Sequence, residues 1–131
     1  MRWMLDTNIC IYIIKRSSAQ IIDALRRRES EGIGVSSVTA AELTFGVAKS
    51  GSARNRSALE DFLGSLEIAP FDEAAAWVYG DVRAELEASG LPIGPLDTQI
   101  AAHALSLDVT LVSNNLREFQ RVRGLRCVNW A

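Results

Sequence analysis

The sequence predicts an α/β fold in which a parallel sheet of four to five strands is covered by helices on both faces. Short, nearly continuous apolar runs alternate along the chain with longer stretches of helical periodicity. Such runs are typical of strands buried on both faces, and the intervening helices supply the crossovers that parallel strands need. The chain has 131 residues and shows no repeat, low-complexity tract or linker, so we expect one domain over residues 1–131.

Each predicted element follows from its local composition. Five apolar runs predict strands near 3–5, 33–37, 66–71, 109–113 and 125–128. Six periodic stretches predict helices near 8–15, 18–30, 39–49, 54–65, 73–89 and 96–107. Hydrophobic residues make up 48% of the chain, which is enough to build a core and excludes a disordered protein.

Four acidic residues stand where strands end or where neighbouring helices begin. Asp6 directly follows the first strand, and Glu42 lies near the start of the helix after the second strand. Asp97 lies at the start of the helix before the fourth strand, and Glu118 comes shortly after that strand. The carboxyl ends of parallel strands share one edge of the sheet, where ligands bind in open α/β sheets. These carboxylates can therefore converge at that edge.

A purely structural interpretation also exists for three of these acids. Asp6 can cap its helix, and Thr39 and Glu42 have the spacing of a capping box. Asp97 can complement the helix dipole behind Pro95. The flanking residues favour a chemical role, because small or apolar residues surround both Glu42 and Asp97. For each residue taken singly, both interpretations stay open.

The grouping of these carboxylates predicts a bound cation. Clustered carboxylates repel one another and raise each other's pKa unless a cation neutralises them. Mg²⁺ prefers one or two direct carboxylates and several waters, with further acids outside. Such an ion polarises a phosphoryl oxygen and activates water, as hydrolysis of a phosphodiester requires. The four acids therefore predict magnesium-dependent phosphodiester chemistry.

Two other ligand-binding classes share this type of fold and are disfavoured. A phosphoryl-receiver module could use Asp6 and Asp72, but it also needs a lysine after the last strands, and no lysine follows Lys49. Asp72 is better interpreted as a helix N-cap. Dinucleotide binding requires a glycine-rich turn after the first strand, and the nearest glycine after Leu5 is Gly32.

Four segments carry a resemblance to a known family. They are MLDTNICIYIIK (4–15), VSSVTAAELTFGVAKS (35–50), LPIGPLDTQIAAHAL (91–105) and TLVSNNLREFQRVRGLRCVNW (110–130). With these segments the chain resembles the PIN-domain ribonucleases, specifically the VapC toxins of bacterial toxin–antitoxin pairs. Among these toxins it is most similar to the group that cuts initiator tRNA in the anticodon stem-loop. The segments span almost the whole chain in the family's order, so the resemblance implies a single PIN domain over residues 1–131.

The resemblance assigns roles to the acidic residues. Asp6, Glu42 and Asp97 match the three acids that surround Mg²⁺ or Mn²⁺ in the family. Many relatives have an aspartate where this chain has Asn115, while others use the acid that matches Glu118. We therefore expect Glu118 to supply or support the fourth carboxylate, and Asn115 to be a neutral hydrogen-bonding residue in the wall of the catalytic site.

Three polar neighbours are expected to support these residues. Asn8 and Thr98 stand close to acids in the sequence, and Ser113 ends the fourth strand. Polar groups beside metal ligands commonly orient carboxylates or waters, and we expect that role for all three.

The resemblance implies a magnesium-dependent endoribonuclease toxin. Its favoured substrate is initiator tRNA, whose cleavage in the anticodon stem-loop inhibits translation, and a cognate VapB antitoxin neutralises it. Metal-assisted hydrolysis leaves 5′-phosphate and 3′-hydroxyl ends. Two alternatives stay open. One is the same nuclease acting on another tRNA, rRNA or mRNA. The other is a catalytically weak PIN-like module that binds RNA or protein, because Asn115 stands where an acid is common.

The net charge of −2 excludes a protein whose whole surface grips nucleic acid, but this charge is unevenly distributed. Residues 58–108 contain ten acidic residues and one basic residue, whereas both flanking segments are basic. Lys49, Arg54, Arg117 and Arg121 lie near the segments that hold the acids, and they are the candidates for contacts with RNA phosphates. An acidic pocket with a basic rim is thus compatible with RNA binding.

Apolar residues on the helices predict interfaces. Leu43, Phe45 and Val47 belong to a surplus of apolar side chains that fits a homodimer interface and a groove for an apolar antitoxin segment. No apolar run is long enough for a secretion signal or a membrane span, so we expect a soluble, cytoplasmic protein without membrane contact.

The remaining notable residues are expected to have structural roles. The three tryptophans, His103 and both cysteines are expected in the core. The arginines at 26–28 are expected at a solvent-facing helix end, with Glu29 and Glu31 as their partners.

Overall fold

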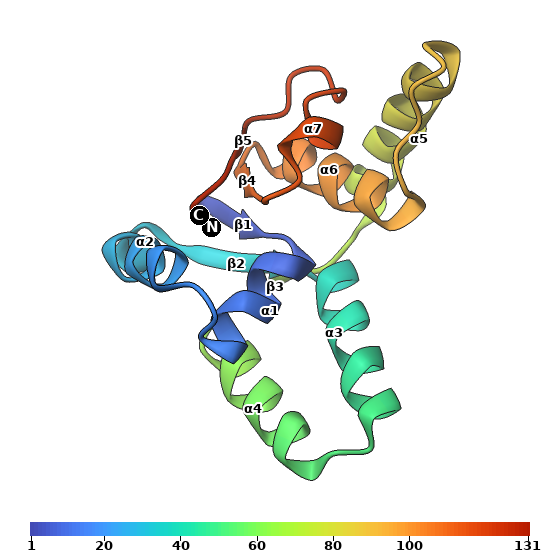
Figure 1. Cartoon of the computed structure of the whole chain (residues 1–131). Helices are drawn as coiled ribbons and strands as arrows, with labels where there is room; N and C mark the ends of the chain where they lie inside the picture. Colours follow the sequence, from blue (N-terminus) through green and yellow to red (C-terminus); the bar gives the residue numbers. More distant parts are fainter.

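The computed structural model describes every residue from Met1 to Ala131 and confirms the predicted fold class. Five parallel strands form one sheet in the order β3-β2-β1-β4-β5 (Figure 1). The strands are β1 (Trp3–Leu5), β2 (Ile33–Ser36), β3 (Glu67–Ala69), β4 (Thr110–Val112) and β5 (Cys127–Val128). Four of them are shorter than the apolar runs that predicted them, because a strand extends only as far as its register with a neighbour.

Seven helices and one 3₁₀ turn connect these strands. They are α1 (Thr7–Lys15), α2 (Ala19–Arg28), the 3₁₀ turn (Glu29–Glu31), α3 (Ser37–Ser50), α4 (Ala53–Gly64), α5 (Glu73–Ala88), α6 (Pro95–Leu107) and α7 (Leu116–Phe119). In Figure 1, α3 and α4 form a hairpin that projects to one side of the sheet, while α5, α6 and α7 lie on the other side. No helix is long and apolar enough to cross a membrane.

Two apolar cores of 11 buried residues each pack against the sheet. Because successive residues of a strand point to opposite faces, the central strands divide their side chains between the two cores. Met4 and Leu111 join the core with α5, α6 and α7. Leu5 and Val112 join the core with α1, α2, α3 and α4. The sheet is therefore covered on both faces, as the continuous apolar runs predicted.

The strand order places the centre of the sheet at a topological switch point. From β1 the chain moves through β2 to β3 on one side, and it then returns to β4 on the other side of β1. In open α/β sheets, ligands bind beyond the carboxyl ends of the strands at such a point. Asp6 directly follows β1 and Ser113 directly follows β4, so these two residues mark the expected centre of a site.

Local sequence sets the helix ends, with one correction to the predicted caps. Asp72 is the N-cap of α5, as expected, and its side chain accepts a hydrogen bond from the backbone N–H of Ala75 at 3.0 Å. The N-cap of α3 is Ser36, so this helix begins two residues earlier than predicted. Thr39 is consequently buried within the first turn, and the capping-box interpretation of Thr39 and Glu42 is wrong.

Two of the residues expected in the core behave differently from each other. His103 is buried, and its Nδ1 lies 2.8 Å from Oγ of Ser36, which joins α6 to the end of β2. Trp77 is 72% exposed, so the expectation of three core tryptophans is wrong at this position. The buried face of α5 contains Ala75, and Trp77 lies about 200° around the helix from it. Both cysteines are free thiols.

Candidate active site

Asp6 stands directly after β1 and is only 5% exposed. Its Oδ1 accepts a hydrogen bond from the backbone N–H of Ile9 at 2.9 Å, so the residue also caps α1. Burial raises the pKa of Asp6 above the usual aspartate value; hydrogen bonds from Ser113 and Ile9 lower it in part, and the charge of Glu42 raises it again. Asp6 is thus a helix cap and, at the same time, a buried carboxylate that faces another carboxylate.

Glu42 reaches the site from the second turn of α3. Its Oε1 accepts a hydrogen bond from the hydroxyl of Thr7 at 2.9 Å. Thr7 is the first residue of α1, so this contact joins the beginnings of two helices. Sequence reasoning missed Thr7, although its place directly after Asp6 at a strand end was a usable signal.

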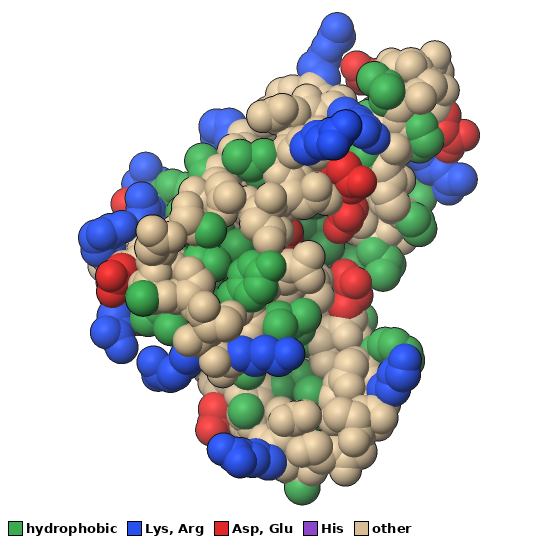
Figure 2. All heavy atoms as spheres, viewed as in Figure 1, with side chains coloured by type: hydrophobic (Ala, Val, Ile, Leu, Met, Phe, Trp, Pro, Cys, Tyr) green, Lys and Arg blue, Asp and Glu red, His purple; other side chains and the backbone are tan.

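Asp97 is the third residue of α6, half-buried behind Pro95 at the first helical position. Its pKa is raised to about 6, first by burial and then by the charges of Asp6, Glu118 and Glu42. Carboxylates change each other's pKa in this way only when they lie close together. The structure therefore brings all four predicted acids to one site, and Figure 2 shows acidic side chains gathered in the hollowed middle of this face with basic side chains around them.

Asn115 and Glu118 form a pair at the fourth position. Nδ2 of Asn115 donates to Oε2 of Glu118 at 2.9 Å, and the backbone N–H of Asn115 donates to Oγ of Ser113 at 2.9 Å. The amide therefore acts as a hydrogen-bonding residue that orients the glutamate, and Glu118 supplies the charge that acts on Asp97.

Of the three expected supporting residues, Ser113 alone contacts one of the carboxylates. It is buried and hydrogen-bonds to Asp6. Asn8 is exposed and its side chain forms no hydrogen bond within the protein. The hydroxyl of Thr98 donates to the carbonyl of Gly94 at 2.8 Å, because a helical threonine readily bonds the carbonyl four residues earlier. Asn8 and Thr98 therefore form no hydrogen bond with the carboxylates within the protein, and their expected role in orienting carboxylates or waters stays a prediction.

None of the four carboxylates forms an ion pair. The six ion pairs of the protein use other acids, namely Glu31, Glu60, Glu67, Glu85, Glu87 and Asp108. No three His, Cys, Asp or Glu side chains lie close enough together to enclose a metal ion by themselves. This spacing fits Mg²⁺ or Mn²⁺ bound by one or two carboxylates and several waters, and such a cation would relieve the repulsion that raises the pKa of Asp97.

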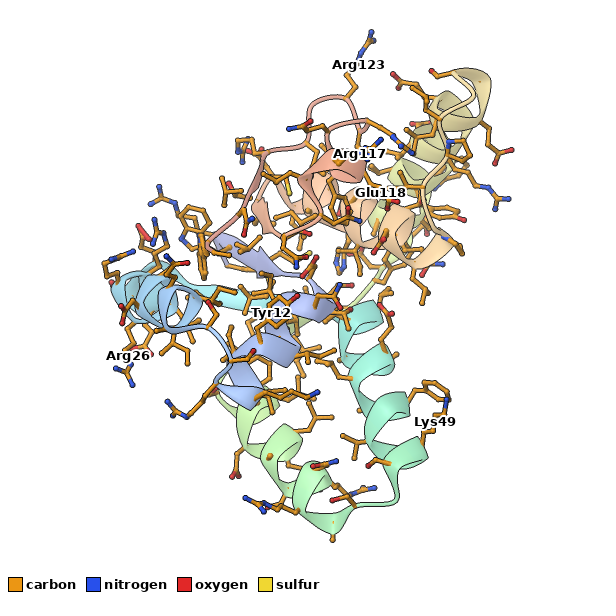
Figure 3. The ribbon with its side chains drawn as sticks, in the orientation of Figure 1. Tyr12, Arg26, Lys49, Arg117, Glu118 and Arg123 are labelled. Carbon is orange, nitrogen blue, oxygen red and sulfur yellow. The ribbon has the colours of Figure 1, made fainter.

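The expected RNA-binding residues differ in whether their side chains already have a partner within the protein. Lys49, Arg54 and Arg117 are exposed and form no ion pair. Figure 3 shows Lys49 and Arg117 on opposite sides of the middle of this face. Arg121 lies beyond the end of α7, and its Nη1 donates to the carbonyl of Pro92 at 3.1 Å. One donor of Arg121 is thus already used to hold the loop before α6.

An apolar groove between α1, α3 and α4 adjoins the acids. Its volume is about 310 Å³. Its aliphatic walls include Ile11, Ile14, Leu43, Val47 and Leu59. Thr7 and Glu42 line the same groove, so it reaches the acidic site.

Comparison with known proteins agrees with this geometry. The family model of the PIN domain matches residues 3–125, a range that contains all four acids. The chain is 42% identical over 132 residues to the tRNA(fMet)-specific endonuclease VapC of Shigella flexneri, and the match covers 100% of this chain and 99% of that protein. The chain belongs to the VapC family of PIN-domain proteins. Ribonuclease VapC2 of Haemophilus influenzae is 46% identical to this VapC-family chain, with 99% of this chain and 98% of the relative covered.

Solved structures of VapC-family complexes share the fold over the whole chain. The crystal structure of VapBC2 from Rickettsia felis, bound to a DNA fragment from its promoter, matches with a TM-score of 0.92 at 41% identity. That match covers 100% of both chains. The DNA-bound VapBC from Salmonella typhimurium matches with a TM-score of 0.93 at 40% identity and covers 100% of this chain and 99% of the other.

Proposed function

We propose that this protein is a magnesium-dependent endoribonuclease toxin that hydrolyses RNA phosphodiesters. Its favoured substrate is initiator tRNA, cut in the anticodon stem-loop so that translation is inhibited. The observation that carries the proposal is the set of four carboxylates at the carboxyl edge of the sheet, none of which has a cationic partner. The name of the Shigella flexneri relative, a tRNA(fMet)-specific endonuclease, supports the choice of substrate.

The residues of this chain would hold the metal and keep its ligands in place. Of Asp6, Glu42 and Asp97, one or two would bind Mg²⁺ directly, with Mn²⁺ as an alternative ion, and the others would act through its waters. The ion would polarise a phosphoryl oxygen and lower the pKa of water. The Ile9 N–H fixes one oxygen of Asp6, and the Thr7 hydroxyl fixes one oxygen of Glu42. With a pKa of about 6, Asp97 is mostly ionised at neutral pH and can act as a ligand.

Free cations around the acids would hold the RNA. Lys49, Arg54 and Arg117 have no acidic partner within the protein and can contact phosphates, which makes RNA affinity dependent on salt. Metal-assisted hydrolysis does not use the ribose 2′-hydroxyl as the nucleophile, so preference for RNA would come from shape and docking. The products would carry 5′-phosphate and 3′-hydroxyl ends.

A VapB-type antitoxin is the proposed protein partner, and the groove between α1, α3 and α4 is its proposed binding site. The aliphatic walls suit an apolar segment. Because Glu42 lines the groove, the same segment could place an arginine against the carboxylates and block the site. The VapBC complexes from Rickettsia felis and Salmonella typhimurium support this kind of partner. We place the protein in the cytoplasm, where its proposed RNA substrate is found.

Exposed apolar side chains support a homodimer. Phe45 is 67% exposed and Leu96 is 43% exposed, although both are large and apolar. They line one hollow of about 610 Å³ between α3 and α6. Apolar patches of this kind mark interfaces on soluble proteins. Phe45→Glu should therefore shift the protein toward the monomer in sedimentation experiments.

A catalytically weak PIN-like binding module is the second candidate, and one observation favours it. Asn115 is neutral at the position where the resemblance to the VapC toxins leads us to expect an acid. Its hydrogen bond to Glu118 supports catalysis instead, because it orients a carboxylate into the same site.

Cleavage of initiator tRNA by purified, antitoxin-free protein distinguishes these candidates. The wild type should cut with Mg²⁺ and stop when the metal is chelated, whereas Asp97→Asn should be inactive. Asp108→Asn is a matched control, because it removes an exposed carboxylate that already has an arginine partner. Undiminished activity in both Asp6→Asn and Asp97→Asn would contradict the proposal. Sequencing the 5′ ends of RNA cut in cells after brief induction then identifies the substrate.

A further inference from the structure

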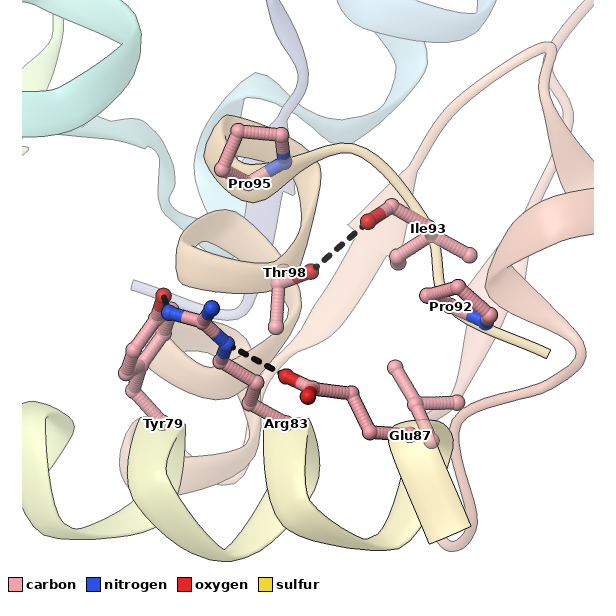
Figure 4. Close-up of a pocket in the computed structure, with 8 residues that line it drawn as sticks. Tyr79, Arg83, Glu87, Pro92, Ile93, Pro95 and Thr98 are labelled. Atoms are coloured by element: carbon pink, nitrogen blue, oxygen red, sulfur yellow. Dashed lines mark hydrogen bonds and ion pairs between the residues drawn. The ribbon is translucent and has the colours of Figure 1, made fainter. Parts of the chain in front are cut away.

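A second pocket lies beside the loop that precedes α6, and the catalytic arrangement described above does not use it. Its volume is about 380 Å³, which is within the usual range for small-ligand sites. One wall comes from α5, with Tyr79, Arg83 and Leu86, and the opposite wall comes from the loop, with Pro92 and Ile93 (Figure 4).

Arg83 contacts two partners on its own helix at this pocket. Its Nε donates to Oε2 of Glu87 at 2.7 Å, and its Nη1 donates to the hydroxyl of Tyr79 at 3.1 Å. Each partner lies one helical turn away, so both contacts orient the guanidinium along α5, while the side chain stays 60% exposed to solvent. The second terminal nitrogen has no hydrogen bond within the protein and is free to donate to a ligand. Figure 4 shows the guanidinium between Tyr79 and Glu87, across the pocket from Ile93.

The pocket adjoins the acidic site through the loop between α5 and α6. Thr98, which lines the pocket, directly follows Asp97 in α6. A side-chain carbon added at Gly94 would lie 3.9 Å from Oδ2 of Asp97, so the backbone of the loop packs close to this carboxylate. Arg121 holds the same loop through the carbonyl of Pro92. Thr98 and the loop residues thus place the pocket next to Asp97 along the chain, although none of the four acids lines it.

We propose that this pocket takes one unstacked base of the RNA, beside the bond that is cut, and that Arg83 donates a hydrogen bond to an acceptor atom on the edge of that base. The inference rests on the proposed ribonuclease function and deepens it, because it assigns a specificity-determining residue. Pro92 and Ile93 provide apolar surface for the faces of a base. Arginine donors commonly recognise acceptor atoms on bases, those of guanine above all.

The charge around Arg83 favours a base over a phosphate as its target. Arg83 is the single basic residue between positions 58 and 108, a stretch with ten acidic residues. Its ion pair with Glu87 offsets its charge, so the residue is a poor electrostatic clamp for a phosphate. What remains is an N–H donor at the mouth of a partly apolar pocket, on a side chain oriented by two intramolecular contacts. Directional donors of this kind read sequence, whereas phosphate contacts mainly position the chain.

Steady-state cleavage kinetics of initiator tRNA test the assignment. Arg83→Gln should raise KM about tenfold while kcat stays within about twofold, because the base contact is made before and during the chemical step. Tyr79→Phe removes the hydroxyl that orients the guanidinium and should raise KM by a smaller factor. Arg126→Gln is the matched control: it removes a guanidinium that also pairs with a carboxylate, Asp108 at 3.0 Å, but beside the opposite edge of the sheet. Its KM should equal that of the wild type, and the melting temperatures show that each variant is folded.

Direct titration with guanosine 5′-monophosphate gives a readout that does not depend on cleavage. Saturable NMR shifts at Arg83 and Ile93 in the wild type, reduced in Arg83→Gln, would support the base pocket. An unchanged KM in Arg83→Gln beside an active wild type would overturn it and leave the ribonuclease function intact. Weaker antitoxin binding by Arg83→Gln with unchanged RNA kinetics would also overturn it, because the pocket would then be a protein contact. If the wild type cuts no RNA with Mg²⁺, the proposed function fails, and the nucleotide titration still decides whether the pocket binds a base.

Discussion

Both edges of the sheet carry acidic residues, but acids at the amino edge form ion pairs and those at the carboxyl edge do not. At the amino edge, Glu31 accepts hydrogen bonds from Nη1 of Arg2 at 3.1 Å and from Nε1 of Trp3 at 3.0 Å. Asp108 at the same edge pairs with Arg126 at 3.0 Å. At the carboxyl edge, four carboxylates face one another without any cationic partner. The comparison teaches that the clustering of unpaired carboxylates, rather than acidity itself, distinguishes the site of chemistry.

Aromatic rings hold a further cation in place at the amino edge. The guanidinium of Arg28 lies 5.3 Å from the ring centroid of Trp3 and 5.1 Å from that of Trp130. The two rings themselves pack edge to face at 5.6 Å. This arrangement replaces the ion pairs with Glu29 and Glu31 that the sequence suggested for Arg28, and it holds the C-terminus against β1.

The largest expected effect comes from removing one carboxylate at the unpaired edge. Asp6→Asn should lower the rate of tRNA cleavage about 10³-fold, because it removes a metal ligand from the centre of the site. Folding should survive, since asparagine caps a helix as well as aspartate and the burial of a charge is avoided. Single-turnover cleavage and thermal melting measure both effects. A variant within tenfold of the wild-type rate would place the chemistry elsewhere.

Metal binding at the carboxyl edge should stabilise the folded protein. At a Mg²⁺ concentration of about 100 times its Kd, the free energy of unfolding should rise by about 2.7 kcal/mol, provided that the ion binds only the folded state. Urea unfolding with and without Mg²⁺ measures the rise. Asp6→Asn should lose most of it, whereas Asp108→Asn at the amino edge should retain it. Equal stabilisation of both variants would show that the ion binds outside the acidic site.

The pairing of Asn115 with Glu118 should matter less than a direct ligand. Asn115→Ala removes the amide that donates to Glu118, and we expect activity to fall about tenfold with little change in melting temperature. Asn114→Ala is a neighbouring control, because its amide donates to the hydroxyl of Tyr12 and contacts no acid. Full activity in Asn115→Ala would contradict the orienting role of the amide.

The stability of the metal-free protein should increase as the pH falls, because the pKa of an unpaired acid is raised in the folded state. The folded protein raises the pKa of Asp97 from 3.8 to about 6, so the folded state binds this proton more tightly than the unfolded state. Protonation of Asp97 therefore stabilises the metal-free protein as the pH falls from 7 through 6 toward 4, and the gain is lost as the pH rises again. Burial lowers the pKa of His103 and acts in the opposite direction, with stability lost below its ordinary value of 6.5.

Urea unfolding of the wild type and Asp97→Asn at pH 7 and pH 5 isolates the aspartate, because His103 is common to both proteins. The stability of the wild type relative to the variant should increase at pH 5. The cleavage rate should change in the opposite sense and fall as the pH is lowered, because protons compete with the metal ion for Asp97. A relative stability that is the same at both pH values would contradict the raised pKa.

The smallest effect is expected at the paired edge. Glu31→Gln weakens an exposed ion pair and should lower the free energy of unfolding by less than about 1 kcal/mol, with unchanged cleavage. Denaturant titration and the tRNA assay measure the two quantities. A large loss of activity would show that the amino edge also takes part in the reaction.

Much of the site could be predicted from the sequence because its residues stand at strand ends. Asp6, Glu42, Asp97 and Glu118 were each identified from their place beside a strand or at a helix start, and the fold class implied a shared edge. The supporting contacts could not be predicted. Thr7 hydrogen-bonds to Glu42, which lies 35 positions away in the sequence. The hydroxyl of Thr98 bonds to a carbonyl at the start of its own helix, and its side-chain rotamer sets this contact.

The order of strands and helices, the covered sheet and the edge at which the acids gather all follow from the amino-acid sequence. These features depend on periodicity and on contacts within a few residues, so they can be read along the chain. Only the tertiary structure decided which charges are paired, which hydroxyl holds Glu42, and that Arg83 faces a pocket beside the loop that packs against Asp97. Pairing and burial depend on how segments far apart in the sequence lie against one another. That arrangement forms only when the two apolar cores pack on the faces of the sheet.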